Sequence, residues 1–301
     1  MDIYNKAKEI YDTDSQEYLT STYKMGICMA TFQRKNGKTP QYLTKSLNSI
    51  LSQTADNWHI YLVGDKYEDD NEFNKLASLI PSDKITSLNL PLAVERENLS
   101  GENLWKQGGA NAINTANKMA LDDNCEYILH LDDDDNFHPK KIQLLNYICS
   151  VFTEPSFIFH LSTYTNTILP SGTDTIKTIE KNTVAVEKAN IIHSSFCIHK
   201  SIINNFKYSS YIPNKTDYIP GDMEFIDYLN KCLEDTSKYT IFIPLLLCYH
   251  DIERESQNAG NKKFKKNKKN ISKKNKKSRY RKTKTRKART FNAASNTTHL
   301  I

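Results

Sequence analysis

The sequence has 301 residues, of which 38% are hydrophobic and 25% are charged, so it can bury the core of one soluble domain. The formal net charge of +6 combines two parts of opposite sign. Residues 262–289 hold 17 lysines and arginines, whereas residues 1–261 carry 24 basic and 35 acidic side chains, a net charge of −11. The acidic body and the basic tail therefore need separate explanations.

Cysteine spacing and apolar runs exclude several classes of protein. The six cysteines form no CxxC pair, which argues against a zinc ribbon and is typical of free thiols in a reducing compartment. The N-terminus has no apolar signal sequence. The longest apolar run, residues 241–249, is far shorter than the roughly 20 residues that span a bilayer. These features predict a cytoplasmic protein with no transmembrane segment.

Strand and helix patterns alternate after a predicted N-terminal arm or helix over residues 1–24. The predicted strands are Gly26–Thr31, Trp58–Val63, Ile85–Leu90 and Tyr127–Leu131. Apolar or small residues recur at helical spacing in three segments, which predicts one helix after Pro40, one from Trp105 to Leu121 and one that begins at Pro139. This alternation indicates an α/β fold with a mostly parallel central sheet flanked by helices.

The pattern changes after residue 157. Four shorter strands are predicted, at Phe157–Tyr164, Thr167–Ile168, Thr175–Ile179 and Thr183–Val186. A helix is predicted to begin near Gly221, and a last strand covers Tyr239–Tyr249. Because this last strand contains Pro244, it should lie at an edge of the sheet or contain a bulge. Residues 257–301 have almost no apolar side chains and cannot offset their ordering entropy by burial. We expect a folded domain over residues 25–256 and a disordered basic tail over residues 257–301.

Four adjacent carboxylates, Asp132 to Asp135, follow the apolar strand at Tyr127–Leu131. Ligands of open α/β sheets bind beyond the carboxyl ends of the strands, and two other predicted strands also end there in polar residues. The carboxylates repel one another, and a divalent cation would offset this repulsion. Hard oxygen ligands suit Mg²⁺ or Mn²⁺. The alternative is a solvated acidic loop that caps the helix at Pro139.

Several segments together resemble the family 2 glycosyltransferases, which have the GT-A fold. The segments CMATFQR, YLTKSLNSILSQTADNWHIYLVGD, AINTANKMA and YILHLDDDDNFHPKKI occur in the order and spacing of that family. The resemblance covers residues 25–145 well, as a nucleotide-sugar half, and residues 146–256 loosely, as an acceptor half. It implies a metal-dependent transferase that moves a sugar from a nucleotide-diphosphate sugar to an acceptor hydroxyl. We expect the donor to be a UDP-sugar.

The resemblance also implies roles for single residues in the donor pocket. Thr31 and Arg34 would line the nucleotide pocket, and Asp65 would contact the base or ribose. Asp132 would lie toward the ribose as the first member of a DxD pair. The alternatives are that Thr31 is a polar strand end, Arg34 a surface charge and Asp65 a turn residue. Asn114 is also expected to bind the nucleotide sugar. Two departures from the family concern the donor: a single Asp65 stands where paired carboxylates are common, and Asn114 belongs to an Ala-Ile-Asn segment in place of Ala-Arg-Asn, so an arginine expected near the donor is missing.

The remaining implied roles concern the metal and the acceptor. Asp134 and Asp135 would hold the metal, with His250 as a third ligand or a diphosphate contact; a lone histidine after an apolar run can also simply be hydrogen-bonded. The family inverts the anomeric centre with a carboxylate base, for which Asp222 is the first choice and Glu224 the second. Asp222 could instead cap the helix that begins near Gly221.

Three other functions compete with a glycosyltransferase. The basic tail could bind nucleic acid or other polyanions, or permit nuclear or membrane-surface association. A nucleotidyltransferase also uses paired aspartates, but it would not explain the segment YLTKSLNSILSQT. A catalytically inactive GT-A domain could serve as a binding module. The acceptor, whether glycan, protein or lipid, and the oligomeric state stay open at this point.

Overall fold

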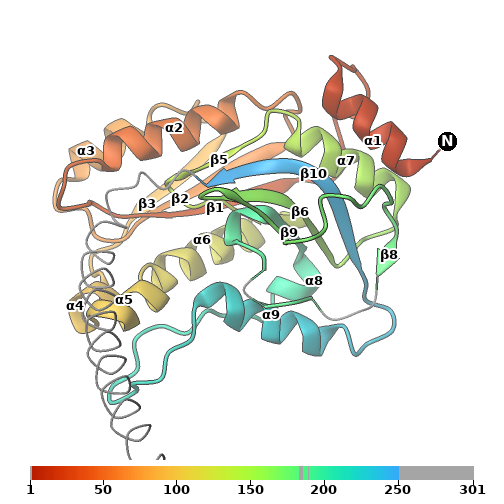
Figure 1. The fold of residues 1–301 in the computed structure, drawn as a ribbon. Coiled ribbons are helices and arrows are strands. Elements are labelled where there is room, and N and C mark those ends of the chain that lie inside the picture. Colours follow the sequence, from red (N-terminus) through yellow and green to blue (C-terminus); the bar gives the residue numbers. More distant parts are fainter. Residues whose placement is uncertain (1, 183–185, 189, 251–301) are drawn as a thin grey trace, which may run out of the picture. The chain divides into compact units, whose positions relative to one another are not determined.

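Four adjacent parallel strands form the first half of the sheet (Figure 1). The computed structural model describes residues 2–182, 186–188 and 190–250. The strands are β1 (Met25–Thr31), β2 (Trp58–Gly64), β3 (Ile85–Asn89) and β4 (Tyr127–His130), in the order β3-β2-β1-β4. Strands β1 and β4 are apolar and almost wholly buried, as expected for strands covered on both faces. The predicted strands of this half are confirmed to within one residue at every end.

The second half of the sheet is mixed. Its strands continue the order as β4-β9-β6-β10-β5, with β9 antiparallel to both neighbours and β10 parallel to β6 but antiparallel to β5. Their bounds are β5 (Asp135–Phe137), β6 (Phe157–Tyr164), β9 (Phe196–His199) and β10 (Thr240–His250), and the short strands β7 (Thr167–Leu169) and β8 (Lys181–Asn182) pair with β6 and β10. The expected parallel arrangement thus holds for residues 25–130. Pro244 lies in a bulge of an interior strand, between Ile243 and Leu246, rather than at an edge.

Helices cover both faces of the sheet (Figure 1). One face carries α1 (Ile3–Asp12), α2 (Thr39–Leu51), α3 (Asp70–Ala77) and α7 (Lys141–Val151), and the other carries α6 (Ala110–Asp122), α8 (Lys200–Ile203) and α9 (Gly221–Cys232). The short helices α4 (Val94–Asn98) and α5 (Gly101–Gln107) precede α6. Along β1, Ile27 and Met29 pack into the first cluster while Cys28 packs into the second, because successive side chains of a strand point to opposite faces.

The N-terminal helix α1 packs into the body of the domain. Its Ala7 and Ile10 are fully buried in the core that α2 and α7 share. The hydroxyl of Tyr147 on α7 donates a hydrogen bond to the carbonyl of Ile3 at 3.3 Å. The described residues form one compact unit, in which no helix combines the length and the apolar character needed to cross a membrane. The predicted tail, residues 257–301, lies outside the described residues.

Two predicted elements differ from the structure. The helix expected from Trp105 to Leu121 is interrupted, because Gly109 has a φ of +88°, a left-handed conformation that ends α5 and caps α6. Residues 175–179 form no strand, since four of the five are exposed and show no alternation of buried and exposed positions. Of the strand expected over Thr183–Val186, residues 183–185 lie outside the described residues.

The small-residue side of α6 fits closely against β1. A Cβ atom at Gly26 would lie 3.0 Å from Cβ of Ala120 and 3.1 Å from Sγ of Cys125. Ala112, Ala116 and Ala120 are all fully buried. This close approach lies at the amino end of β1; at the other end, a Cβ atom at Gly109 would lie 3.7 Å from Cβ of Ala30, so α6 begins near the carboxyl end of β1.

Candidate active site

The four aspartates, here called the aspartate loop, follow β4 at the carboxyl ends of the parallel strands, and the last of them, Asp135, is the first residue of β5. The amide of Asp135 donates to the carbonyl of Asp132 at 3.0 Å, which closes the turn. Neighbouring strands bring Thr31 and Asp65 to the same edge, and the amide of Asp65 donates to the Thr31 carbonyl at 2.7 Å. Because β5 pairs antiparallel with β10, the loop also lies beside His250 at the end of the chain's last described strand. The topology therefore gathers residues from both halves of the sequence.

Asp133 points inward and pairs with Arg34. Arg34 donates through Nη1 to Oδ2 of Asp133 at 2.8 Å and through Nη2 to Oδ1 at 2.5 Å. The hydroxyl of Thr31 donates to the same Oδ2 at 2.7 Å and lies 2.8 Å from the hydroxyl of Tyr67. Arg34 also reaches Asp134 at 3.3 Å. One of the four carboxylates is thus neutralised within the protein, and Thr31 and Arg34 both hold the aspartate loop.

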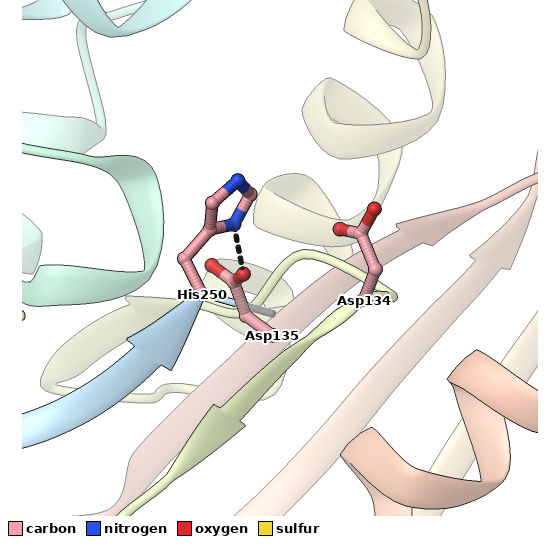
Figure 2. Close-up of side chains that lie close together, drawn as sticks. All are labelled: Asp134, Asp135 and His250. Carbon is pink, nitrogen blue, oxygen red and sulfur yellow. Dashed lines mark hydrogen bonds and ion pairs between the residues drawn. The ribbon is translucent and has the colours of Figure 1, made fainter. Parts of the chain in front are cut away.

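Asp134, Asp135 and His250 form a cluster with metal-ligand spacing. One ligand atom from each residue lies within 4.8 Å of the others. Figure 2 shows Asp135 next to the His250 ring, with Asp134 on the same loop and its carboxylate directed to the same side. Nδ1 of His250 and Oδ1 of Asp135 form an ion pair, and the His250 ring stacks on Tyr164 with centroids 4.8 Å apart. The opposite atoms, Oδ2 of Asp135 and Nε2 of His250, are buried and have no hydrogen-bond partner among the described residues.

The charges in this cluster oppose one another. Burial and the Asp133 and Asp135 carboxylates raise the pKa of Asp134 to about 6, although Arg34 acts in the opposite direction. Burial alone would lower the pKa of His250, but its hydrogen bond to Asp135 and the nearby carboxylates raise it to about 8. Two carboxylates and one imidazole thus lie close enough for each to shift the pKa of a neighbour.

Asp132 is not one of these three residues. Its side chain is about half exposed, at 50%, and its amide donates to Oγ of Ser194 at 3.0 Å. Nδ1 of His193 lies 4.0 Å from Oδ1 of Asp132. His193 and Ser194 belong to a short turn, η1 (His193–Ser195), just before β9. No sequence pattern marked this turn, because only the antiparallel pairing of β9 with β4 brings it to the aspartates.

Asp65 is buried and paired with an arginine that sequence reasoning missed. Oδ2 of Asp65 accepts from Nε of Arg96 at 2.6 Å, while Oδ1 is buried without a hydrogen-bond partner among the described residues. Burial raises the pKa of Asp65, and Arg96 partly offsets the rise. The Arg96 guanidinium lies 3.5 Å from the centroid of the Phe32 ring, whose other close cation is Arg34 at 4.6 Å. The sequence signal was a single arginine in the segment VEREN, which carries no recognisable spacing.

Asn114 makes structural contacts. Its Nδ2 donates to the carbonyl of Tyr208, and its Oδ1 accepts from the Tyr208 amide, both at 2.9 Å. The Tyr208 hydroxyl lies 3.3 Å from Nδ1 of the buried His130. Both ends of the Asn114 side chain are therefore used to hold the segment before α9 against α6.

Asp222 and Glu224 lie in the first turn of α9 but face different surroundings. The helix is capped by Pro220, so Asp222 does not occupy the N-cap position. Asp222 lies near His193: burial lowers the pKa of His193, and the Asp222 carboxylate acts in the opposite direction. Glu224 instead accepts from the amide of Ser209 at 2.9 Å and from the Ser209 hydroxyl. Asp222 accepts through Oδ1 from the amide of Met223 at 2.8 Å, and its neighbour His193 links it to Asp132, while Glu224 holds a loop in place.

Comparison with known proteins identifies the relatives of this chain. A curated protein of Acanthamoeba polyphaga mimivirus, named as an uncharacterized glycosyltransferase, is 35% identical over 246 residues, which cover 79% of this chain and 98% of the relative. No protein-family model matches the chain.

Solved structures agree in fold. S. aureus TarS 1–349 in complex with UDP has a TM-score of 0.54 at 13% identity, over 77% of this chain and 61% of that one. The mannosyltransferase PcManGT of Pyrobaculum calidifontis, in complex with GDP-Man and Mn²⁺, has a TM-score of 0.53 at 12% identity, over 84% and 64%. The chain spans about three fifths of the length of these solved structures. The fold and the close viral relative together show that the chain belongs to the glycosyltransferases, with a GT-A-type fold.

Proposed function

We propose that this protein is a metal-dependent, inverting transferase of the family 2 type, which moves a hexosyl group from a UDP-sugar to an acceptor hydroxyl. The observation that carries the proposal is the cluster of Asp134, Asp135 and His250 at the carboxyl edge of the sheet. Ligands of open α/β sheets bind at that edge. Relatives of the same fold are known with UDP, with UDP-GlcNAc, and with GDP-Man and Mn²⁺.

The residues of the cluster fit a divalent cation. Oδ2 of Asp135 and Nε2 of His250 are buried polar atoms without partners among the described residues, and such atoms are costly unless something binds them. Carboxylate oxygens with one imidazole nitrogen suit Mn²⁺ or Mg²⁺. The Asp135 carboxylate also orients the His250 ring through Nδ1, which leaves Nε2 for the metal. A bound cation would supply charge neutralisation for the departing diphosphate.

The donor pocket in this proposal combines direct contacts and supporting ones. Arg96, held by the buried Asp65, lies on the Phe32 ring at the ends of β1 and β2, and this polar and aromatic pair would suit a nucleobase. Asp132, whose side chain is half exposed beside the η1 turn, would contact the ribose. Thr31 and Arg34 would contribute to nucleotide binding indirectly, because both bind Asp133 and so hold the aspartate loop in place.

The acceptor side supplies the base. In a single displacement, the acceptor hydroxyl oxygen attacks the anomeric carbon, the bond from that carbon to the diphosphate oxygen breaks, and Asp222 takes the hydroxyl proton. Asp222 is preferred to Glu224 because both oxygens of Glu224 already accept hydrogen bonds from Ser209. The acceptor would be a glycan, a protein or a lipid that carries such a hydroxyl.

The test is a panel of nucleotide sugars with and without Mn²⁺, read out as released nucleoside diphosphate. We expect release from a UDP-sugar only when the metal is present. Anomeric configuration of the product, measured by NMR, checks inversion. A chain that binds UDP but releases none from any donor would be a catalytically inactive member of the fold, and the proposal would then be wrong.

A further inference from the structure

A lysine is completely buried beneath the aspartate loop. Lys141, the first residue of α7, has 0% of its surface exposed. Its Nζ lies 3.5 Å from the centroid of the Phe137 ring, and among the described residues no carboxylate pairs with it. Burial lowers the pKa of Lys141 to about 8. Burying an amine that can carry charge is unfavourable, and an apolar side chain of similar length would pack on Phe137 without this cost.

Among the residues that the structure describes, the ammonium group of Lys141 donates to one acceptor, which belongs to the η1 turn. Nζ donates to the carbonyl of Ser194 at 2.9 Å. The hydroxyl of the same residue accepts from the amide of Asp132 at 3.0 Å. Ser194 is itself fully buried, so neither bond competes with bulk water. A continuous set of contacts therefore runs from Lys141 through Ser194 to the first residue of the aspartate loop.

The contacts of Ser194 connect the two ends of the segment from Asp132 to Lys141. Asp132 begins the segment that continues through β5 to Phe137 and Lys141, and the Ser194 contacts join its start to its end. The same turn carries His193, whose Nδ1 lies 4.0 Å from Oδ1 of Asp132. A shift of Ser194 would therefore move Asp132 relative to Asp135, which the pairing of β5 with β10 holds in place.

We propose that Lys141 is a positioning residue: through the Ser194 carbonyl it holds the η1 turn, and the Ser194 hydroxyl in turn holds the backbone of Asp132 where the nucleotide binds. This inference rests on the proposed function for the consequence at the nucleotide. The local link between Lys141 and the Asp132 amide stands without it.

The experiment measures both levels in the full chain. Amide hydrogen exchange by NMR reports on the Asp132 amide, with the neighbouring Leu131 amide, bound to the Cys28 carbonyl at 3.1 Å, as the internal reference. Calorimetry measures UDP affinity in the presence of Mn²⁺. The variants are Lys141→Met and Ser194→Ala. Lys140→Met is the matched control, because it removes an adjacent, mostly buried lysine that does not contact Ser194.

We expect Lys141→Met and Ser194→Ala each to speed exchange at Asp132 about tenfold, the equivalent of one lost hydrogen bond, without a matching change at Leu131. UDP affinity should fall by a similar factor, and Lys140→Met should stay within about twofold of wild type.

Equal exchange at Asp132 in Lys141→Met and Lys140→Met would overturn the inference, and so would a uniform rise at both reference and test amides. If Lys141→Met does not fold, wild-type exchange in Ser194→Ala would overturn it as well. Should wild type bind no UDP, the proposed function fails, while the exchange data still decide the role of Lys141.

Discussion

Replacing Arg34 with methionine should destabilise the fold through the charge left on Asp133. The Asp133 side chain is 6% exposed and the Arg34 side chain 14%, and two hydrogen bonds join them. Removing one partner of a buried ion pair typically costs about 3–5 kcal/mol. Because Thr31 would still donate to Asp133, we expect the lower end, about 3 kcal/mol. For a domain of this size that is a fall in Tm of roughly 6–12 °C.

The assay is urea denaturation followed by circular dichroism, with thermal melts alongside. Lys35→Met is the control, since Lys35 is an exposed neighbour and its loss should change the free energy of unfolding by less than about 0.5 kcal/mol. In the double variant Arg34→Met/Asp133→Asn the orphaned charge is gone, so part of the stability should return.

Two results would refute this reasoning. An Arg34→Met variant as stable as Lys35→Met would show that the ion pair contributes nothing. A double variant no more stable than Arg34→Met would place the loss in packing, because the Arg34 guanidinium also lies 4.6 Å from the Phe32 ring centroid and 5.2 Å from that of Tyr42.

The remaining predictions concern the metal, the base and the tail. Asp134→Asn should abolish the dependence of UDP affinity on Mn²⁺ with little change in Tm; equal UDP affinity of wild type in Mn²⁺ and in EDTA would contradict the metal site. Asp222→Asn should slow transfer by about 10²–10⁴ with near-normal UDP affinity, whereas Glu224→Gln should chiefly lower Tm, and full activity in both variants would remove this region from the mechanism. A chain that ends at Asn261 should keep its Tm, because the described core lies within residues 2–250, and should lose salt-sensitive binding to heparin; unfolding of the shortened chain would show that the tail is structural.

Local pattern was enough to predict most elements of the fold. Apolar runs of strand length and helical spacing predicted β1, β2, β3, β4 and α2, because burial on a sheet or a helix face imposes a short-range period that a sequence records directly. The limits of this reasoning appear at Gly109, where a left-handed residue interrupts a helical pattern that is otherwise continuous. They also appear in the second half of the sheet, because the direction in which β9 pairs is not encoded in its own four residues.

For the carboxylates of the aspartate loop, too, the sequence predicted one property and the tertiary structure decided another. Their crowding predicted a cation at the strand end, since like charges at one place need an opposite charge whatever the fold. Only the tertiary structure separates them, with Asp133 turned inward to Arg34, Asp135 paired with His250 across β5 and β10, and Asp132 held by the η1 turn. No spacing in the sequence marked Arg96 or Lys141 as partners of the site. The spacing of apolar residues along the sequence indicates which residues are buried. The partner of each buried charge depends instead on strand register and on the connections between strands, because the paired residues are 31 to 115 positions apart in the sequence.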